Sequence, residues 1–306
     1  WAILDSGLNT SMVRNIWENV FEFILNKAPI TKIIITHYHP DHMGLAGWLH
    51  ERTGASLYMT RDEYLLGQFL LLGSSDIVPK EVLNFYREAG FPEFALEMMK
   101  EKGFSNYKKG VANLPKQYLR LQEGEVLKIG KRDWKILVGS GHSPEHACLY
   151  SETDGILISG DQVLPKITSN ISVYPTEPMA NPLKNWLDSL CYLKVNTKPD
   201  TLTLPAHNQV FLGLHKRLVE IHQGHVRRLK MVSEECKELK SAVEVFPALF
   251  KRKLSGIDFI LGVGEALAHL HYLEIKGVLG RRLVDGVIRF KRLRNFDPNK
   301  DLEEIL

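Results

Sequence analysis

The stretch Thr36-His37-Tyr38-His39-Pro40-Asp41-His42 holds three imidazoles and one carboxylate within six residues. It directly follows the apolar run Ile33-Ile34-Ile35, which is typical of a buried strand. Side chains of an extended segment alternate with a period of two, so His37 and His39 project to the same side. The proline that follows ends the strand, so that the last two ligand-type residues lie in a turn. Two pairs of such side chains, aimed from one turn, predict a site for metal ions.

The chemistry of these side chains limits which metals suit the site. Zinc, manganese and iron accept histidine and carboxylate ligands, whereas calcium prefers oxygen alone. The alternative for this stretch is a solvated polar turn between a strand and a helix. Four ligand-type residues at this spacing favour the metal site, in which Asp41 is also a candidate catalytic carboxylate. We expect two divalent ions, zinc before manganese or iron.

Three further ligand-type residues, His142, Asp161 and His207, stand where apolar strands are predicted to end. Ligands at strand ends can converge on the open edge of a sheet, and all three are therefore candidates for the same site. Asp5 likewise follows the first apolar strand, although a turn or a helix cap would by itself be the simpler interpretation for this residue.

Composition describes an ordinary globular protein. The chain has 306 residues, of which 44% are hydrophobic and 25% charged, enough for one large and one smaller domain. Its three cysteines are odd in number and far apart, which argues against a disulfide framework and for a reducing, cytoplasmic location. No apolar run is long enough for a membrane span, so no membrane partner is expected. The chain opens on Trp1 without a methionine and shows no signal peptide, and we expect that its true N-terminus is missing or was trimmed.

The first 60 residues alternate between predicted strands and helices. The helix expected over residues 11–27 has one apolar face. That face consists of Met12, Ile16, Val20, Phe23 and Ile24.

Residues 61–120 lack strand alternation and predict helices over 61–72, 78–90 and 92–102. This segment reads as a helical insertion between sheet strands. Its aromatic and aliphatic side chains favour either packing of helices against the sheet, or a cap over the site, or the surface of a homodimer.

The remaining chain predicts strands first and helices afterwards. Strands are expected at 125–129, 134–138, 147–150, 156–159 and 201–204, with a helix over 181–195. A long helix over 214–239 and shorter helical segments then precede an alternating stretch around Asp285-Gly286, which is a hairpin signal. On the long helix, His222 and His225 are interpreted as part of a solvated face. His269 and His271 are expected to be buried.

Charge is distributed unevenly between the two parts of the chain. Residues 210–306 carry 18 Lys and Arg against 13 Asp and Glu, a net charge of +5, whereas residues 1–209 carry 21 against 23, a net charge of −2. Six basic residues surround the predicted hairpin: Arg281, Arg282, Arg289, Lys291, Arg292 and Arg294. A nucleic-acid partner is the less favoured interpretation, because +5 is modest for such a surface, and a small-molecule substrate is expected instead.

Taken in order, the motifs around Asp5, His37 to His42, Gly-His142-Ser-Pro-x-His146, Gly-Asp161 and Leu-Pro-Ala-His207 resemble the metallo-β-lactamase superfamily. The resemblance covers about residues 1–210 and implies an α/β fold, the αββα sandwich, with metals at one edge of its two sheets. It implies a catalytic domain over residues 1–212, with the helical insertion or cap at 61–120. A C-terminal winged-helix-like domain is expected over residues 213–306.

The resemblance also implies a role for each candidate residue. His37, His39 and His142 would bind one metal, and Asp41, His42 and His207 the other. Asp161 would bridge the two ions, while Asp5 and His146 would orient the ligands from behind.

The implied activity is hydrolysis by a hydroxide that bridges two metals. We expect a small acyl substrate, namely a thioester, an ester or a lactone, and thus an enzyme of class EC 3.1. The alternative is an endoribonuclease or phosphodiesterase that uses the basic C-terminal module. A regulatory protein with a non-catalytic metal site is a third interpretation.

Three departures from known branches narrow this expectation. The zinc β-lactamases have a cysteine where Asp161 stands, or lack a full two-metal set of this kind, so antibiotic hydrolysis is not expected. The glutathione-binding pattern of the glyoxalase-II-like enzymes is not recognisable near the C-terminus. The lactonase branch has a tyrosine shortly after the bridging aspartate, a place that Tyr174 could take here only if its loop folds back.

Overall fold

The computed structural model describes residues 1–73, 77–102 and 107–302. A first sheet has four parallel strands in the order β1 (Ala2–Leu4), β2 (Lys32–Ile34), β3 (Ser56–Met59) and β4 (Leu119–Arg120). A second sheet has five strands in the order β5 (Val126–Ile129), β6 (Arg132–Gly139), β7 (His146–Ser151), β8 (Ile156–Gly160) and β9 (Leu202–Pro205). It is antiparallel except for the parallel pair β8 and β9.

Alternation of side chains along the strands produces a four-layered structure. In β2 and just beyond it, Ile33 and Ile35 pack toward helices on one face, whereas Ile34 packs into the core between the two sheets. In β6, Ile136 faces the same core between the sheets and Leu137 faces helices on the outer side. Residues 33–35 and 136–138 are covered on both faces and are therefore all apolar. The predicted αββα sandwich is confirmed.

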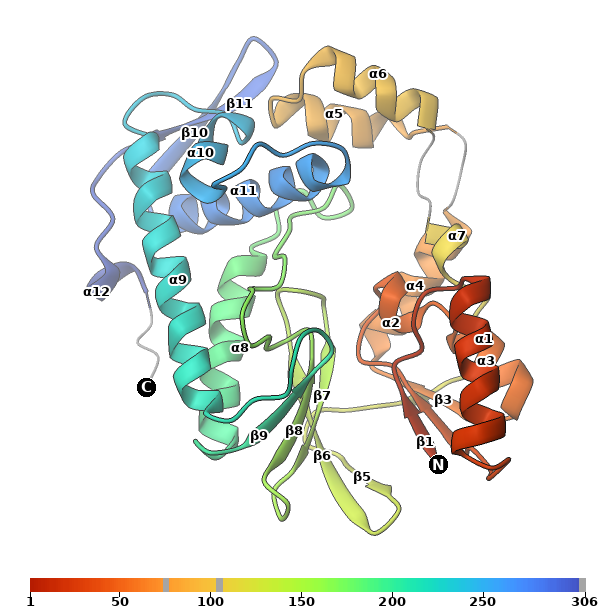
Figure 1. Cartoon of the computed structure of the whole chain (residues 1–306). Coiled ribbons are helices and arrows are strands. Elements are labelled where there is room, and N and C mark those ends of the chain that lie inside the picture. Colours follow the sequence, from red (N-terminus) through yellow and green to blue (C-terminus); the bar gives the residue numbers. More distant parts are fainter. Residues whose placement is uncertain (74–76, 103–106, 303–306) are drawn as a thin grey trace.

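Helices cover both outer faces of the sandwich (Figure 1). On the first sheet lie α1 (Ser11–Asn19), its π-helical continuation η1 (Val20–Ile24), the short α2 (Pro40–Met43) and α3 (Ala46–Thr53). On the second lie α8 (Pro182–Asn196) and α9 (Leu214–Glu235). The helix expected over residues 11–27 thus exists in two parts, but the face predicted for it is wrong. Met12, Ile16, Phe23 and Ile24 are exposed, and the core contacts come from Val13, Trp17 and Phe21.

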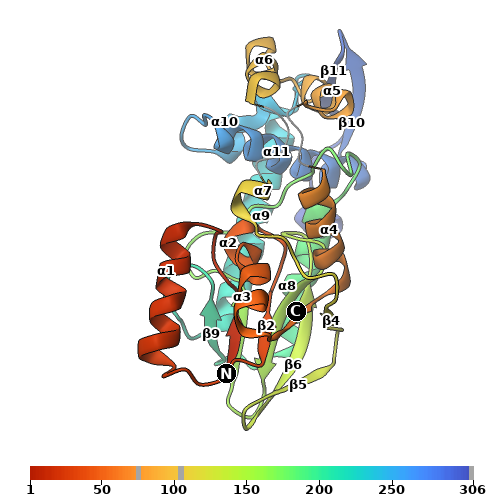
Figure 2. The same ribbon diagram turned by 90° about the vertical axis from the view of Figure 1, so that its right-hand side faces the viewer.

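The helices predicted for residues 61–120 are present, and they pack in two different places. The first, α4 (Arg61–Leu72), and the short α7 (Tyr107–Gly110) lie against the first sheet. The others, α5 (Lys80–Glu88) and α6 (Glu93–Lys102), pack against the C-terminal part of the chain, as Figure 2 also shows. The insertion therefore connects the sandwich to the C-terminal helices. A lid or dimer role for it remains a prediction.

The C-terminal part has the predicted order of helices followed by a hairpin. After α9 come η2 (Val243–Val245), α10 (Phe246–Leu249) and α11 (Ile257–Ile275), then the hairpin β10 (Leu279–Val284) and β11 (Val287–Arg292), and finally α12 (Pro298–Asp301). Asp285 and Gly286 both have positive φ, as the tight turn predicted for this hairpin requires. The likeness to a winged helix remains a prediction, and residues 303–306 of that predicted domain lie outside the described residues. No helix in the described ranges has the length and apolar character needed to cross a membrane.

Candidate metal centre

Strand direction brings the predicted ligands to one edge of the sandwich. The carboxyl ends of β1 and β2 point the same way because these strands are parallel. In the second sheet β6, β8 and β9 also run in one direction, because β7 is antiparallel to β6 and β8 and because β9 is parallel to β8. The two sheets are joined at this edge, where the Ala147 amide donates to the Thr36 carbonyl over 2.9 Å. All seven predicted ligands follow these strand ends.

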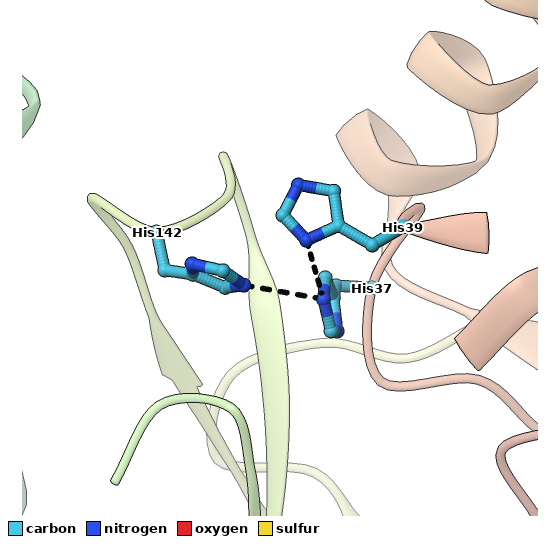
Figure 3. Close-up of side chains that lie close together, drawn as sticks. All are labelled: His37, His39 and His142. Carbon is cyan, nitrogen blue, oxygen red and sulfur yellow. Dashed lines mark hydrogen bonds between the residues drawn. The ribbon is translucent and has the colours of Figure 1, made fainter. Parts of the chain in front are cut away.

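Three imidazoles form the first group (Figure 3). Nε2 of His37 lies 2.9 Å from Nδ1 of His39 and 3.3 Å from Nε2 of His142, which comes from the other sheet. In a tetrahedral site with metal–nitrogen bonds of about 2.0–2.1 Å, neighbouring nitrogens lie about 3.3 Å apart. The three nitrogens therefore have the spacing of ligands to one ion.

The second group combines histidine with carboxylate. Nε2 of His207 lies 3.3 Å from Asp41 and 3.4 Å from Asp161, and Nε2 of His42 lies 3.5 Å and 3.4 Å from the same two carboxylates. Asp161 also reaches the first group, 3.6 Å from Nε2 of His142. Its carboxylate thus lies between the two groups, as predicted for a bridging ligand. Asp41 and His207 are each 45% exposed, so the second group opens toward solvent.

Hydrogen bonds orient three of the imidazoles. Nδ1 of His142 donates to the Asn170 carbonyl over 2.8 Å, and Nδ1 of His42 donates to Asp5 over 2.8 Å. Nδ1 of His37 contacts the Thr36 hydroxyl over 2.9 Å, and that hydroxyl in turn donates to Asp5. In His37 and His142 the proton therefore resides on Nδ1, which leaves the Nε2 lone pair directed into the cluster, as metal ligands require. His42 would present Nε2 in the same way once a metal displaced its second proton.

Asp5 supports the cluster from behind, as predicted. Its φ of 58° is unusual for a residue other than glycine, although Asp tolerates this region better than most. In that conformation its carboxylate accepts from the Thr36 amide, the Thr36 hydroxyl and the His42 ring over 2.8–2.9 Å. The sequence motif Asp-Ser-Gly at a strand end was the signal for this role.

His146 contacts the cluster but is not arranged as a ligand. Its Nε2 accepts from the Asp161 amide over 3.1 Å, and this contact holds the backbone of the central carboxylate. The preceding Gly160 has a φ of +50°, and an added Cβ would lie 2.5 Å from the His146 ring. Glycine is therefore required before Asp161, because the His146 ring lies too close to residue 160 for a side chain there.

Charge effects match a site built for cations. Burial lowers the pKa of His37, His39 and His142, so these rings are neutral, which is the form that binds metal. For His42 burial also lowers the pKa, but Asp161, Asp41 and Asp5 outweigh it and raise the pKa to about 12. In the metal-free protein a proton on His42 thus supplies positive charge that the three carboxylates attract.

Two buried atoms at the centre lack a hydrogen-bond partner within the described part of the chain. They are Nε2 of His42 and Oδ1 of Asp161. Buried polar groups are nearly always paired, so two unpaired polar atoms at the centre of one cluster require an explanation. The donor set, the tautomers and these two atoms all fit divalent metal ions.

Sequence reasoning missed Glu63, which lies in the first turn of α4. Its side chain is fully buried and accepts from the Tyr38 amide (2.9 Å), the Glu145 amide (2.8 Å) and the Ser143 hydroxyl (2.6 Å). Burial raises the pKa of Glu63 to about 7 against the opposing effect of these donors. No local signal identified it, because an acidic residue in the first turn of a helix is commonplace.

Tyr174 belongs to a loop that does fold back. The hydroxyls of Tyr38 and Tyr174 share a hydrogen bond, and burial raises the pKa of both. This contact attaches the loop after Asp161 to the histidine-rich segment.

The histidines of the C-terminal helices differ in part from expectation. His269 and His271 are buried, as predicted. His222 and His225 are also buried, so the solvated face predicted for them is wrong, because α11 packs over that side of α9.

Comparison with known proteins agrees with this geometry. Residues 1–207 match the family described as the metallo-beta-lactamase superfamily, and residues 229–293 match the metallo-beta-lactamase-like, C-terminal domain. A crystal structure of a beta-lactamase domain protein from Burkholderia ambifaria is 38% identical, with a TM-score of 0.87 over 95% of this chain and 83% of that one. The probable metallo-hydrolase YqjP of Bacillus subtilis is 20% identical over 96% of this chain and 90% of its own.

A shorter match is to an uncharacterized protein of Aquifex aeolicus. It is 28% identical over 133 residues, which is 43% of this chain and less than half, 48%, of that protein. The match to the metallo-beta-lactamase superfamily covers more than half of the chain and ends at His207, the last of the predicted ligands. The chain belongs to the metallo-β-lactamase superfamily.

Proposed function

We propose that this protein is a metal-dependent hydrolase that cleaves a small acyl substrate, namely a thioester, an ester or a lactone. The observation that carries the proposal is the convergence of seven histidine and aspartate side chains whose ring nitrogens and carboxylate oxygens face one another. His37, His39 and His142 would hold one divalent ion, and Asp41, His42 and His207 a second, with Asp161 shared. Such ions, when bound, acidify water and polarise the oxygen of a carbonyl group.

The chain's own residues would complete the chemistry. Asp41 is half-exposed, and although burial opposes it, hydrogen bonding and charge from His42 hold its pKa well below the usual range. It is therefore ionised at neutral pH and suited to accept a hydrogen bond from an attacking water and orient it. His207 is equally exposed and lies 3.3 Å from Asp41. These two residues are the ones that a substrate would meet first.

The experiment that tests this proposal is an assay panel on protein of known metal content. Zinc, manganese and iron are quantified first, and then a thioester, a lactone, an aryl phosphodiester and a single-stranded RNA are assayed side by side. We expect turnover of at least one acyl substrate, lost on chelation and restored by metal. Cleavage of RNA without acyl turnover would overturn the proposal.

The second candidate, a ribonuclease or phosphodiesterase, depends on the basic C-terminal part. Four of the six basic residues at the hairpin are engaged in ion pairs: Arg281 with Glu274, Arg289 with Glu244, Arg292 with Glu234 and Arg294 with Asp301. Their charge is balanced locally and is less available to phosphates. This observation favours the acyl substrate.

The third candidate is a regulatory protein with a metal site that does not catalyse. It predicts bound metal with no turnover of any member of the panel. The second group opens to solvent at Asp41 and His207, where a substrate could reach the metals, and this opening favours an enzyme.

A further inference from the structure

Tyr38 forms hydrogen bonds through its amide, its carbonyl and its hydroxyl group. Tyr38 lies between His37 and His39 and is itself buried. Its amide donates to Glu63 of α4 over 2.9 Å, its carbonyl accepts from the Tyr107 hydroxyl of α7 over 2.5 Å, and its own hydroxyl shares a hydrogen bond with that of Tyr174. Two of these three partners come from the helical insertion.

Glu63 connects this segment to the second sheet. One of its oxygens accepts from the Tyr38 amide, and the other accepts from the Ser143 hydroxyl and the Glu145 amide. Ser143 directly follows His142 in the chain. A single buried carboxylate therefore spans the two loops that provide all three imidazoles of the first group, one loop from each sheet.

The second group has no comparable connection to Glu63. His42 is oriented by Asp5, and Asp161 is held through its amide by His146. His207 lies on the loop after β9. Glu63 thus joins both loops that carry the first group, whereas of the second group it holds only the loop that carries Asp41 and His42.

We propose that Glu63 is a positioning residue that sets the separation of His37 and His39 from His142, and thereby the affinity of the first metal position but not of the second. The inference rests on the proposed metal centre. It gives the helical insertion a role in building the site, because α4 supplies the carboxylate. Loss of such supporting contacts commonly weakens metal binding by about 10- to 100-fold.

The test uses cobalt as the probe in the full-length protein. Metal-free wild type and Glu63→Gln are titrated with Co²⁺ in competition with a chelator, and the absorption of the bound ion is recorded. We expect wild type to bind two ions. In Glu63→Gln one should be about 10- to 100-fold weaker and the other unchanged. His142→Gln should weaken the same position, whereas His207→Gln should weaken the other.

Asp301→Asn is the matched control for a general loss of stability. Asp301 is also a buried carboxylate, and it accepts from Arg294 and from the Asp297 amide far from the site. Its variant should bind both ions as wild type does. Glu63→Asp, which keeps the charge on a shorter side chain, should give an intermediate affinity.

The outcomes separate the two proposals. Two wild-type-like affinities in Glu63→Gln would overturn the positioning role and leave the hydrolase proposal intact. Equal weakening of both positions, or equal weakening in Asp301→Asn, would also overturn it, because the effect would then be general. Failure of wild type to bind two ions would instead remove the metal centre itself.

Discussion

Two groups of buried histidines lie in this chain, and they differ in what surrounds them. One is the metal centre, with the buried His37, His42 and His142 and the half-buried His39. The other is a helical pair, His225 of α9 and His269 of α11, whose rings are stacked at 5.5 Å, with Nδ1 of His225 3.4 Å from Nε2 of His269. Burial lowers the pKa of His37, His39 and His142 in the metal centre and of both rings of the helical pair, for His269 to about 4. His42 is the exception, because the neighbouring carboxylates raise its pKa.

The difference between the two lies in the neighbouring charges. Asp161 lies within 3.6 Å of ring nitrogens of three histidines in the metal centre. Within the described residues no carboxylate lies within 4.0 Å of the helical pair, and the positive charge of Arg228 acts on both of its rings. A cation is thus attracted to one group and repelled from the other. Burial and a lowered pKa do not by themselves identify a metal site; converging carboxylates do.

Removing the shared carboxylate should have the largest effect. We expect Asp161→Ala, and equally His37→Ala, to lose at least one metal ion and to reduce hydrolysis by on the order of 10³-fold, because the nucleophile and the polarised carbonyl both depend on the ions. Metal analysis and the acyl assay check this result. His215→Ala, a half-buried histidine of α9 outside the site, is the control. Full activity in either site variant would falsify the assignment of ligands.

Removing Asp5, which orients the ligands but is not predicted to bind metal, should have a smaller effect on the metal site. Asp5→Ala leaves the Thr36 hydroxyl and Nδ1 of His42 without their acceptor. We expect a 10- to 100-fold loss of metal affinity, because the His42 ring is then free to rotate and to change tautomer. Chelator competition measures this loss. Asp62→Ala removes a nearby exposed acid and should leave metal affinity unchanged; an Asp5→Ala protein with native affinity would contradict the expectation.

The free energy of unfolding should depend on pH through the titration of Glu63. Burial raises its pKa from 4.5 to about 7, so the folded protein binds this proton more tightly than the unfolded chain does. Stability from this group is therefore complete below about pH 4.5 and is lost as pH rises to about 7, by about 3 kcal/mol in total. In metal-free protein the difference in unfolding free energy between wild type and Glu63→Gln should shift by that amount between pH 4 and pH 8. Denaturant titrations at a series of pH values measure it, and a constant difference would contradict it.

The comparison between the two histidine groups can be tested most directly at His269. Its Nδ1 donates to the Glu265 carbonyl over 2.8 Å. His269→Gln should lower the free energy of unfolding by about 1–3 kcal/mol through lost packing and hydrogen bonding. Metal content should remain that of wild type, whereas His142→Gln, at an equally buried histidine, should lose metal. Metal loss in both variants would show that the two groups are coupled.

Much of the fold could be predicted from local pattern. Apolar runs predicted the strands that precede the ligands, and ligand-type residues at the ends of these strands indicated His142, Asp161 and His207. The apolar face of the helix at residues 11–27 was wrong. Periodicity identifies a stripe of apolar residues, but α1 and η1 place Val13, Trp17 and Phe21 toward the core instead. The burial of His222 and His225 was missed because it depends on which face α11 covers.

The sequence by itself determined the ligand chemistry and its order along the chain, because residue type and strand-end spacing are local properties. Only the tertiary structure decided which residues hold the ligand-bearing loops in place by hydrogen bonds. Glu63 meets donors 25, 80 and 82 residues away, and the hairpin arginines find carboxylates on distant segments. A buried hydrogen bond is formed wherever packing brings a donor to an acceptor, and no local pattern encodes that meeting. The histidine-rich stretch therefore identified the metal centre, and the packing of the insertion against it identified the residue proposed to adjust its geometry.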